Sequence, residues 1–198
     1  MFRLIISAVI GYLLGSVSVA VLLTKGTFGR DVRSQGSGNA GATNVARVFG
    51  MGAGVLTLVG DMAKTALSGL AGYLLAGRLG LTVACCACLI GHCWPVWFGF
   101  CGGKGVSVAG CIALLLDWRF FLAIVGVFTL MFILTHRVSA ASVTAAVTYP
   151  ILYWLILRDT GAGLWVCCII AVIVIILHRG NISRLIKGTE PRFKPKSK

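Results

Sequence analysis

The sequence predicts an all-α, polytopic membrane protein with seven transmembrane helices, its N-terminus outside and its C-terminus in the cytoplasm. Three observations predict this class: 58% of the 198 residues are hydrophobic, the mean hydropathy is +0.96, and long apolar runs alternate with short polar intervals. A bilayer core about 30 Å thick needs about 20 apolar residues per helix. We therefore expect residues 1–198 to form a single integral membrane domain, with a polar loop at 24–50 and a basic tail at 178–198.

The expected spans follow the apolar runs along the chain. The first, Leu4–Leu23, follows Arg3 as in a signal peptide, but it is too long for a typical cleaved segment and is read as a retained span. Its Gly11 and Gly15, four residues apart, predict close contact with another helix. The other six spans are expected at 52–76, 81–98, 106–116, 120–135, 140–157 and 163–177. Pro95 is expected to end or kink the third span, and the fourth is short enough to be partly re-entrant.

The distribution of basic residues predicts the orientation. With the N-terminus outside, thirteen of the 18 Lys and Arg residues fall on the inner side, four on the outer side, and Lys64 lies inside a span. Cytoplasmic loops of membrane proteins carry such an excess. The formal charge of +13 is thus explained by contact with anionic lipid or by a bound polyanion, and nucleic acid is not an expected partner because no soluble basic domain exists.

The polar interval from Gly29 to Gly50 has the composition of an anion site. Its glycines allow a ligand to approach backbone N–H groups closely. Arginine guanidinium groups suit phosphate oxygens, and small polar side chains add neutral hydrogen bonds. The residues concerned are Arg30, Arg33, Arg47, Ser37, Asn39, Thr43 and Asn44. The alternative is an ordinary loop whose arginines only orient the neighbouring span.

One pair of polar residues and two single ones each have both a functional and a structural interpretation. Asp61 and Lys64 lie three residues apart inside the second span, as a functional pair or as a self-neutralising structural pair. Lys104, in a Gly-Gly-Lys-Gly turn, is either a phosphate ligand or an interfacial lysine that extends towards water. His178, at the end of the last span, is either a general base or phosphate donor, or a histidine that stabilises a helix end.

Several familiar motifs are excluded by their context. Gly36-x-Gly38-x-x-Gly41 fits a dinucleotide-binding pattern, but no strand precedes it. Cys85-x-x-Cys88 with the nearby His92 lies in an apolar run, where cysteines pack as small hydrophobic residues. Gly103-Lys104 lacks the following Ser or Thr of a P-loop. Neither a metal nor a cofactor is expected.

Taken together, the motifs resemble the bacterial integral-membrane acyl-phosphate:glycerol-3-phosphate acyltransferases. The resemblance extends from Tyr12 to Phe193 and rests on GSGNAGATN at Gly36–Asn44, on Gly91-His92, on Gly102-Gly-Lys-Gly-Val106 and on His178-x-x-Asn181-x-x-Arg184. It implies a seven-helix fold in the bacterial cytoplasmic (inner) membrane and transfer of a fatty acyl group from acyl phosphate to the 1-hydroxyl of glycerol-3-phosphate. The product would be lysophosphatidic acid, formed in the first acylation of phospholipid synthesis. Functional coupling to an enzyme that makes acyl phosphate is a further implication.

The resemblance also implies roles for individual residues. The catalytic residues would be Ser37, His178 and Asn181, and the substrate-binding residues would be Arg33, Gly38, Asn39, Gly41, Thr43, Asn44, Arg47, Lys64, His92 and Lys104. This chain departs from the expected pattern in having Cys101 in place of Lys, Thr65 in place of Gly and Gly180 in place of Glu. The change at Cys101 removes one expected phosphate-binding charge.

The expected mechanism is direct transfer. An acyl phosphate already has a good leaving group, so the protein mainly neutralises phosphates and holds the hydroxyl against the carbonyl. The proton would pass to His178 or to the substrate's own phosphate, and a covalent acyl-Ser37 intermediate is the competing mechanism. The alternative functions are a transporter of phosphorylated metabolites and a transferase that acts on another phosphorylated alcohol.

Overall fold

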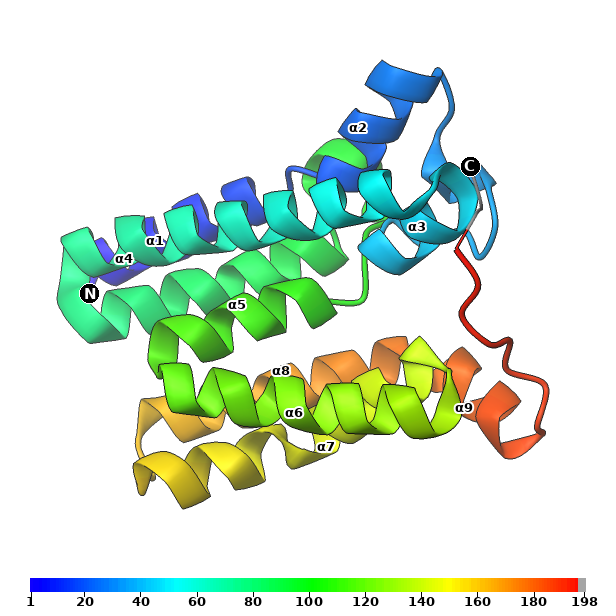
Figure 1. Ribbon diagram of the computed structural model, residues 1–198. Coiled ribbons are helices and arrows are strands. Elements are labelled where there is room, and N and C mark those ends of the chain that lie inside the picture. Colours follow the sequence, from blue (N-terminus) through cyan, green and yellow to red (C-terminus); the bar gives the residue numbers. More distant parts are fainter. Residues whose placement is uncertain (196–198) are drawn as a thin grey trace. The chain divides into compact units, whose positions relative to one another are not determined.

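The structure is a computed structural model that describes residues 1–195, which form helices and no strand (Figure 1). The all-α prediction is therefore confirmed. The described chain forms two compact units, one of Met1–Val108 with the tail from Lys194, and one of Ala109–Phe193. Each unit is described separately below.

The first apolar run forms two helices, α1 (Phe2–Gly15) and α2 (Val19–Phe28). The break between them interrupts the first span predicted from the sequence, and it was not predicted. The Ser18 side chain caps α2 by accepting a hydrogen bond from the Val21 N–H at 3.5 Å. The carbonyls of Gly15 and Val17 accept hydrogen bonds from Lys64 Nζ at 3.0 and 2.8 Å. A buried ammonium therefore stabilises main-chain groups that the break leaves without helical partners.

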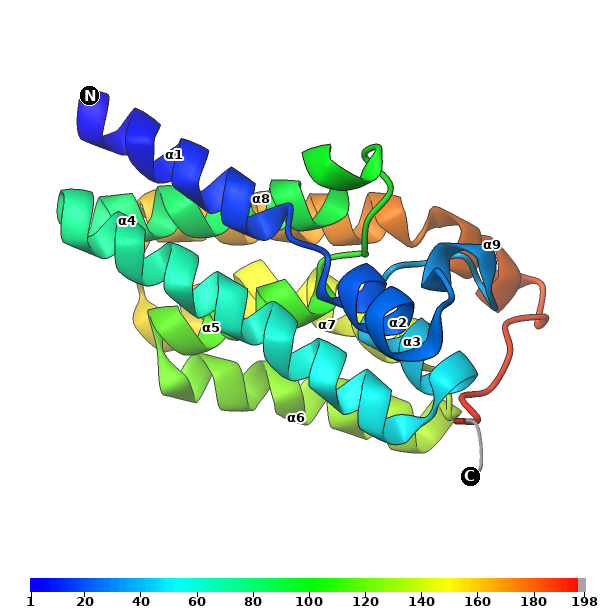
Figure 2. The same cartoon turned by 90° about the horizontal axis from the view of Figure 1, so that it is seen from above.

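The second long apolar region forms α4 (Met51–Cys93), which is broken at Ala76 and Gly77. Gly77 has a φ of +61°, a backbone conformation that glycine adopts without strain. The two limbs, 51–75 and 78–93, fold back on each other, and Gly72 packs against the main chain of Gly80 (Figure 2). The helix ends at Cys93, two residues before Pro95, so the predicted effect of Pro95 is confirmed.

Helix α1 packs along the second limb of α4. Gly11 and Gly15 lie directly against the main chain of Ala84 and Cys88, where no side chain would fit. The close helix contact predicted from the Gly11/Gly15 spacing is confirmed, and it fixes the end of α1 beside the polar part of α4.

The remaining elements of the first unit carry the polar loop. They are the 3₁₀ turn η1 (Val32–Ser34), α3 (Ala42–Phe49) and a second 3₁₀ turn, η2 (Val96–Phe98). A small hydrophobic core anchors them, formed by Ala20, Val21, Val32, Ala40 and Val45. Because Val32, Ala40 and Val45 are buried together, the polar residues between them are held at the surface of this core.

The second unit contains most of α5 (Val106–Leu116), then α6 (Trp118–Thr135), α7 (Val138–Leu157), α8 (Ala162–Leu177) and α9 (Arg179–Ile186). Asp117 caps α6 by accepting from the N–H groups of Arg119 and Phe120 at 2.7 and 3.3 Å. The buried Phe120 ring packs edge-on against Tyr149, with ring centroids 4.8 Å apart. Helices α8 and α9 meet at His178 with a bend of 61°.

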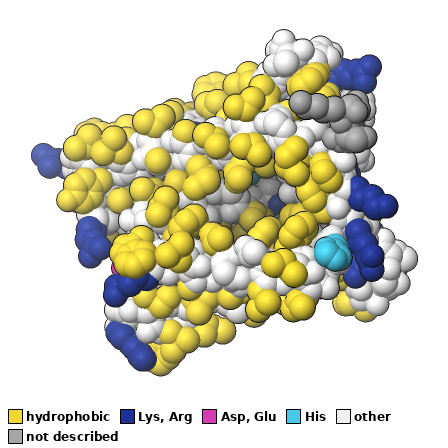
Figure 3. Space-filling model, in the orientation of Figure 1, with side chains coloured by type: hydrophobic (Ala, Val, Ile, Leu, Met, Phe, Trp, Pro, Cys, Tyr) yellow, Lys and Arg dark blue, Asp and Glu magenta, His cyan; other side chains and the backbone are white. Residues whose placement is uncertain are grey.

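The surface of the helices is strongly apolar. In Figure 3, hydrophobic side chains cover the lengths of the helices and Lys and Arg side chains lie at their ends. Among the described residues, four helical segments are long and apolar enough to cross a membrane, or five if α8 and α9 form one broken span. That count treats α4 as one segment and omits the 11-residue α5. The number seven and the orientation of the termini remain predictions.

Candidate active site

Asn44, near the start of α3, holds the polar loop together. Its side chain is buried, and its Nδ2 donates to the carbonyls of Val32, Gln35 and Asn39 at 3.3, 3.0 and 3.1 Å. Its Oδ1 accepts a hydrogen bond from the Ser37 N–H at 3.0 Å. One amide therefore sets the path of the loop on both sides of Ser37, and no part of it projects into solvent.

The loop leads into the N-terminus of α3. Gly41 is the residue before the helix, and its carbonyl accepts from the N–H groups of Asn44 and Val45. The dipole of a helix favours an anion at its N-terminus. Ser37 and Gly38 are exposed, and Asn39 and Thr43 are half-buried. These residues form the accessible polar surface of the loop.

Arg33, predicted to bind substrate, is engaged with protein groups. Its guanidinium forms a forked pair with Asp31, with Nη2 to Oδ2 at 2.8 Å, and Nη1 donates to the Phe98 carbonyl at 2.6 Å. The hydrogen bonds from Arg33 hold the pKa of Asp31 far below its usual range, and Lys25 at 3.2 Å adds to the effect. Arg33 thus ties the loop to the η2 turn, and a phosphate would have to compete with these bonds.

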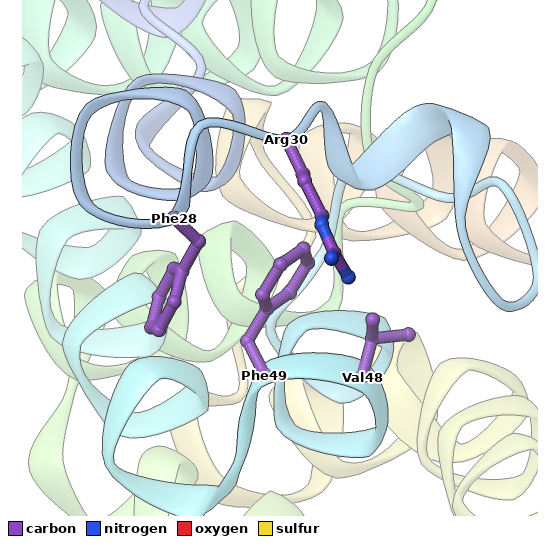
Figure 4. Close-up of a pocket in the computed structure, with 4 residues that line it drawn as sticks. All are labelled: Phe28, Arg30, Val48 and Phe49. Carbon is purple, nitrogen blue, oxygen red and sulfur yellow. The ribbon is translucent and has the colours of Figure 1, made fainter.

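A cavity of about 240 Å³ opens beside the loop and is lined by Phe28, Arg30, Val48 and Phe49 (Figure 4). The two phenylalanine rings have centroids 4.9 Å apart. The Arg30 side chain extends from the loop towards Val48 and Phe49. Aromatic walls with one guanidinium suit an amphiphilic anion. Arg47, the half-buried neighbour of Val48 in sequence, lies in the last turn of α3.

The polar residues of α4 form a buried cluster. Lys64 Nζ lies 3.1 Å from Asp61 Oδ1 and 3.1 Å from His92 Nδ1, in addition to its two bonds to main-chain carbonyls at the α1–α2 break. The other oxygen of Asp61 accepts from Ser107 Oγ at 3.1 Å. The Lys64 ammonium therefore has four protein neighbours, and the structure places it inside the protein instead of at an open anion site.

The glycine turn before Lys104 rests on His92. The Gly103 N–H donates to the His92 carbonyl at 3.1 Å, and Gly102 packs directly against the same carbonyl. The His92 imidazole ring lies against Gly103. Lys104, which is half-buried, follows immediately. The main chain and the imidazole ring of His92 therefore both contact this turn, a contact that was not predicted from the sequence.

The predicted residues of the tail, His178 and Asn181, lie in the second unit, and Asn181 binds a buried carboxylate there. His178 is buried, and its Nδ1 lies 2.8 Å from the Val174 carbonyl. Asn181 Nδ2 donates to Glu190 Oε1 at 2.7 Å. Glu190 also accepts from Ser139 Oγ at 2.7 Å and from Arg184 Nε at 2.7 Å. Glu190 is the organising residue here, and it was not among the residues predicted from the sequence.

The environment of Glu190 stabilises its ionised form. Burial raises the pKa of this carboxyl, but the hydrogen bonds from Ser139, Asn181 and Arg184 more than offset burial, so the pKa lies below its usual value. A carboxyl whose pKa is lowered on folding stabilises the folded state. This stabilisation is complete at pH values above the unfolded pKa of about 4.3. That stabilisation is lost as the pH falls through the lower, folded pKa.

We expect Glu190→Ala to lower kcat by about tenfold, because the change leaves the Asn181 amide and the Arg184 guanidinium without their anchor. Glu190→Gln should retain more activity, since its amide oxygen can still accept from Ser139 and Asn181. Turnover measures the loss of kcat, and limited proteolysis of the tail measures the loss of anchoring. Thr189→Ala, which changes an exposed neighbour of Glu190, is the control. Equal activity in the alanine variant and the wild type would show that Glu190 does not position Asn181.

The structure therefore brings the predicted residues together in groups. Loop residues 33–47 form one group and the His92–Lys104 cluster another, both in the first unit, while His178 and Asn181 belong to the second unit. Within residues 1–195, no three His, Cys, Asp or Glu side chains are arranged to hold a metal ion. The chain has only five acidic residues against 18 basic ones. That scarcity was a usable signal for Glu190 and Asp31.

Comparison with known proteins identifies relatives along the whole chain. The family model for glycerol-3-phosphate acyltransferase matches residues 5–188. A glycerol-3-phosphate acyltransferase of Hyphomonas neptunium is 41% identical over 194 residues, which is 98% of this chain and 94% of that protein. One from Clostridioides difficile is 38% identical over 198 residues, covering 97% and 96% of the two chains.

Solved structures agree with these relatives. The crystal structure of PlsY, an integral membrane glycerol 3-phosphate acyltransferase, in its glycerol 3-phosphate form has a TM-score of 0.90, 34% identity and 96% coverage of both chains. Its lysophosphatidic acid form has a TM-score of 0.86 and 32% identity, and covers 96% of this chain and 95% of that one.

Proposed function

The chain belongs to the glycerol-3-phosphate acyltransferase family, and we propose that it transfers a fatty acyl group from an acyl phosphate to the 1-hydroxyl of glycerol-3-phosphate. The products are lysophosphatidic acid and phosphate. The observation that carries the proposal is the end-to-end likeness to an integral membrane acyltransferase known in forms with acceptor substrate and with product. The accessible polar loop at the N-terminus of α3 supports it.

The proposed reaction requires the protein to neutralise the charges of its substrates more than to activate the acyl donor. An acyl phosphate is a mixed anhydride with a good leaving group, so catalysis depends on orienting two anionic substrates and on stabilising the oxyanion. We assign phosphate binding to Arg47 and Lys104 and to the loop residues Ser37, Gly38, Asn39, Gly41 and Thr43. Asn44 and Arg33 contribute by shaping that loop, as their hydrogen bonds support.

His178 is the proposed proton acceptor. Its Nδ1 faces a carbonyl oxygen at 2.8 Å, and because a carbonyl only accepts hydrogen bonds, Nδ1 carries the proton. Nε2 is then the basic nitrogen, as a general base requires. In direct transfer, the glycerol 1-hydroxyl oxygen bonds to the acyl carbonyl carbon, the bond to phosphate breaks, and the hydroxyl proton passes to Nε2. Trapping an acyl group on Ser37 with donor alone would establish the covalent route instead.

We also propose a seven-span topology in a bacterial inner membrane, with the N-terminus outside and the polar motifs facing the cytoplasm. Dividing α4 at Gly77 and counting α5 as a short span supports this number. A cytoplasmic site would receive acyl phosphate from the enzyme that makes it, and that coupling is part of the proposal.

The decisive assay supplies glycerol-3-phosphate with either palmitoyl phosphate or palmitoyl-CoA to the purified protein in lipid, with chelator and without added metal. We expect lysophosphatidic acid from palmitoyl phosphate alone, because the proposed site neutralises phosphate with side chains and N–H groups. Product from palmitoyl-CoA would overturn the donor class. Absence of product from both donors, with folded protein, would favour a different acceptor or a transporter.

A further inference from the structure

A cluster of three ionisable side chains is buried on α4, and its contribution to stability does not explain why it is there. Asp61, Lys64 and His92 are each at most 6% exposed, in a largely apolar helix. Burying charges costs free energy that a hydrophobic replacement would avoid. The cluster also contacts the chain on both sides of Lys104: the His92 carbonyl accepts from the Gly103 N–H, and Asp61 accepts from Ser107 Oγ.

We propose that Lys64 fixes His92 in its Nε2–H tautomer, so that His92 presents a neutral N–H donor to a phosphate group bound at the Gly102–Lys104 turn. Lys64 is then a positioning residue and His92 the ligand. The inference rests on the proposed function only for the identity of the phosphate compound.

The hydrogen-bond geometry supports this tautomer. An ammonium donates three hydrogen bonds and accepts none. Lys64 Nζ gives the two shortest to the carbonyls of Val17 and Gly15, at 2.8 and 3.0 Å. Its third proton lies between Asp61 Oδ1 and His92 Nδ1, both at 3.1 Å. A proton on Nδ1 would point at an ammonium 3.1 Å away, so Nδ1 is the acceptor and the ring proton lies on Nε2.

The alternative is that His92 donates from Nδ1 to Asp61. That separation is 3.5 Å, beyond the usual range for an N–H donor and a carboxylate. A doubly protonated His92 would give the cluster a net charge of +1 inside an apolar helix pair, whereas a neutral ring leaves Asp61 and Lys64 to balance each other. Both the distances and the charge balance therefore favour Nε2–H.

The Nε2–H is accessible to a ligand. Across the described residues, no fully buried side-chain nitrogen or oxygen lacks a hydrogen-bond partner. The polar contacts of the His92 ring are made by Nδ1, with Lys64 and Asp61. Nε2 therefore retains contact with solvent, on the edge of the ring that faces Gly103. A phosphate at the turn would receive this donor together with the charge of Lys104.

The first test reads the tautomer directly. We would label histidine with ¹⁵N in the full-length protein in detergent micelles, and identify the His92 signals among three histidines by their loss in His92→Gln. The expected spectrum has a protonated Nε2 and an unprotonated Nδ1, and inorganic phosphate or glycerol-3-phosphate should shift the Nε2–H signal. A protonated Nδ1 in the wild type, or an Nε2–H that neither phosphate shifts, would overturn the proposal.

The second test removes the positioning group. Lys64→Met should convert His92 partly to the Nδ1–H form and raise the KM for glycerol-3-phosphate about tenfold, the loss expected for one hydrogen bond, with a smaller change in kcat. Ser68→Ala, one turn further along α4, removes a buried hydroxyl that donates to the Lys64 carbonyl and does not contact His92, and should leave the tautomer unchanged. An unchanged tautomer in Lys64→Met would contradict the proposal.

The experiments distinguish a wrong tautomer of His92 from a wrong assignment of the reaction. Turnover with palmitoyl phosphate by a protein whose His92 carries its proton on Nδ1 would refute only the tautomer. A phosphate-dependent shift at Nε2–H in a protein that makes no lysophosphatidic acid would refute only the reaction. If Lys64→Met does not fold, the spectrum of the wild type with and without phosphate still decides the question.

Discussion

Gly103→Ala is expected to reduce kcat/KM for glycerol-3-phosphate by about 100-fold, the scale expected when a catalytic group is misplaced by about 1 Å. A Cβ at this position would lie against the His92 imidazole, only 2.7 Å from its Cε1. The ring cannot move away easily, because Lys64 binds Nδ1 at its opposite edge. The turn must therefore shift, and Lys104 shifts with it.

Gly110→Ala is the matched control for this change. Gly110 lies in α5, and a Cβ added there meets no atom within 4 Å. The control should retain wild-type kinetics and be slightly more stable, because alanine favours helix. Steady-state kinetics with varied glycerol-3-phosphate measure both variants. Wild-type kcat/KM in a folded Gly103→Ala protein would remove the 102–104 turn from the substrate site.

Asn44→Asp is expected to abolish measurable activity and to lower the stability of the loop, although the two side chains have nearly the same shape. A carboxylate cannot donate, so the carbonyls of Val32, Gln35 and Asn39 would each face a negative oxygen. Leaving a charge buried without a partner costs about 3–5 kcal/mol. The loop around Ser37 would lose the path that places it before α3.

Ser34→Ala provides the control for the loop. Ser34 is exposed, and its hydroxyl donates to the Asp31 carbonyl at 2.9 Å, away from the Asn44 amide. Turnover and the rate of proteolytic cleavage within residues 34–41 should change in Asn44→Asp and not in Ser34→Ala. An Asn44→Asp protein with an uncleaved loop and normal turnover would show that Asn44 does not organise the loop.

Several local features could be predicted because their causes are local. Gly11 and Gly15 lie four residues apart on one face of a helix, which is sufficient to predict a close helix contact. Pro95 cannot continue a helix, whatever surrounds it. The density of glycine and arginine before α3 favours an anion site for a similarly local reason, since those residue types act through their own backbone and charge, and that site remains a prediction.

The roles of Lys64 and Arg33 could not be predicted in the same way. Each is a cation near a phosphate-like motif, and the sequence shows neither the two carbonyls that Lys64 binds nor the Phe98 carbonyl that Arg33 binds. These partners are 47 to 65 residues away along the chain. The break between α1 and α2 was missed for the same reason, since a distant ammonium stabilises it.

The sequence by itself therefore determined the membrane class, the helical fold and the positions of the polar motifs, because hydrophobic length, glycine spacing and charge are properties of neighbouring residues. Only the tertiary structure decided which polar groups face each other. In the structure, the Asn44 side chain holds the polar loop together and Lys64 binds His92. Glu190 accepts the hydrogen bond of the Asn181 amide. In an apolar interior each buried polar group must find a hydrogen-bond partner, and folding brings that partner from elsewhere in the chain.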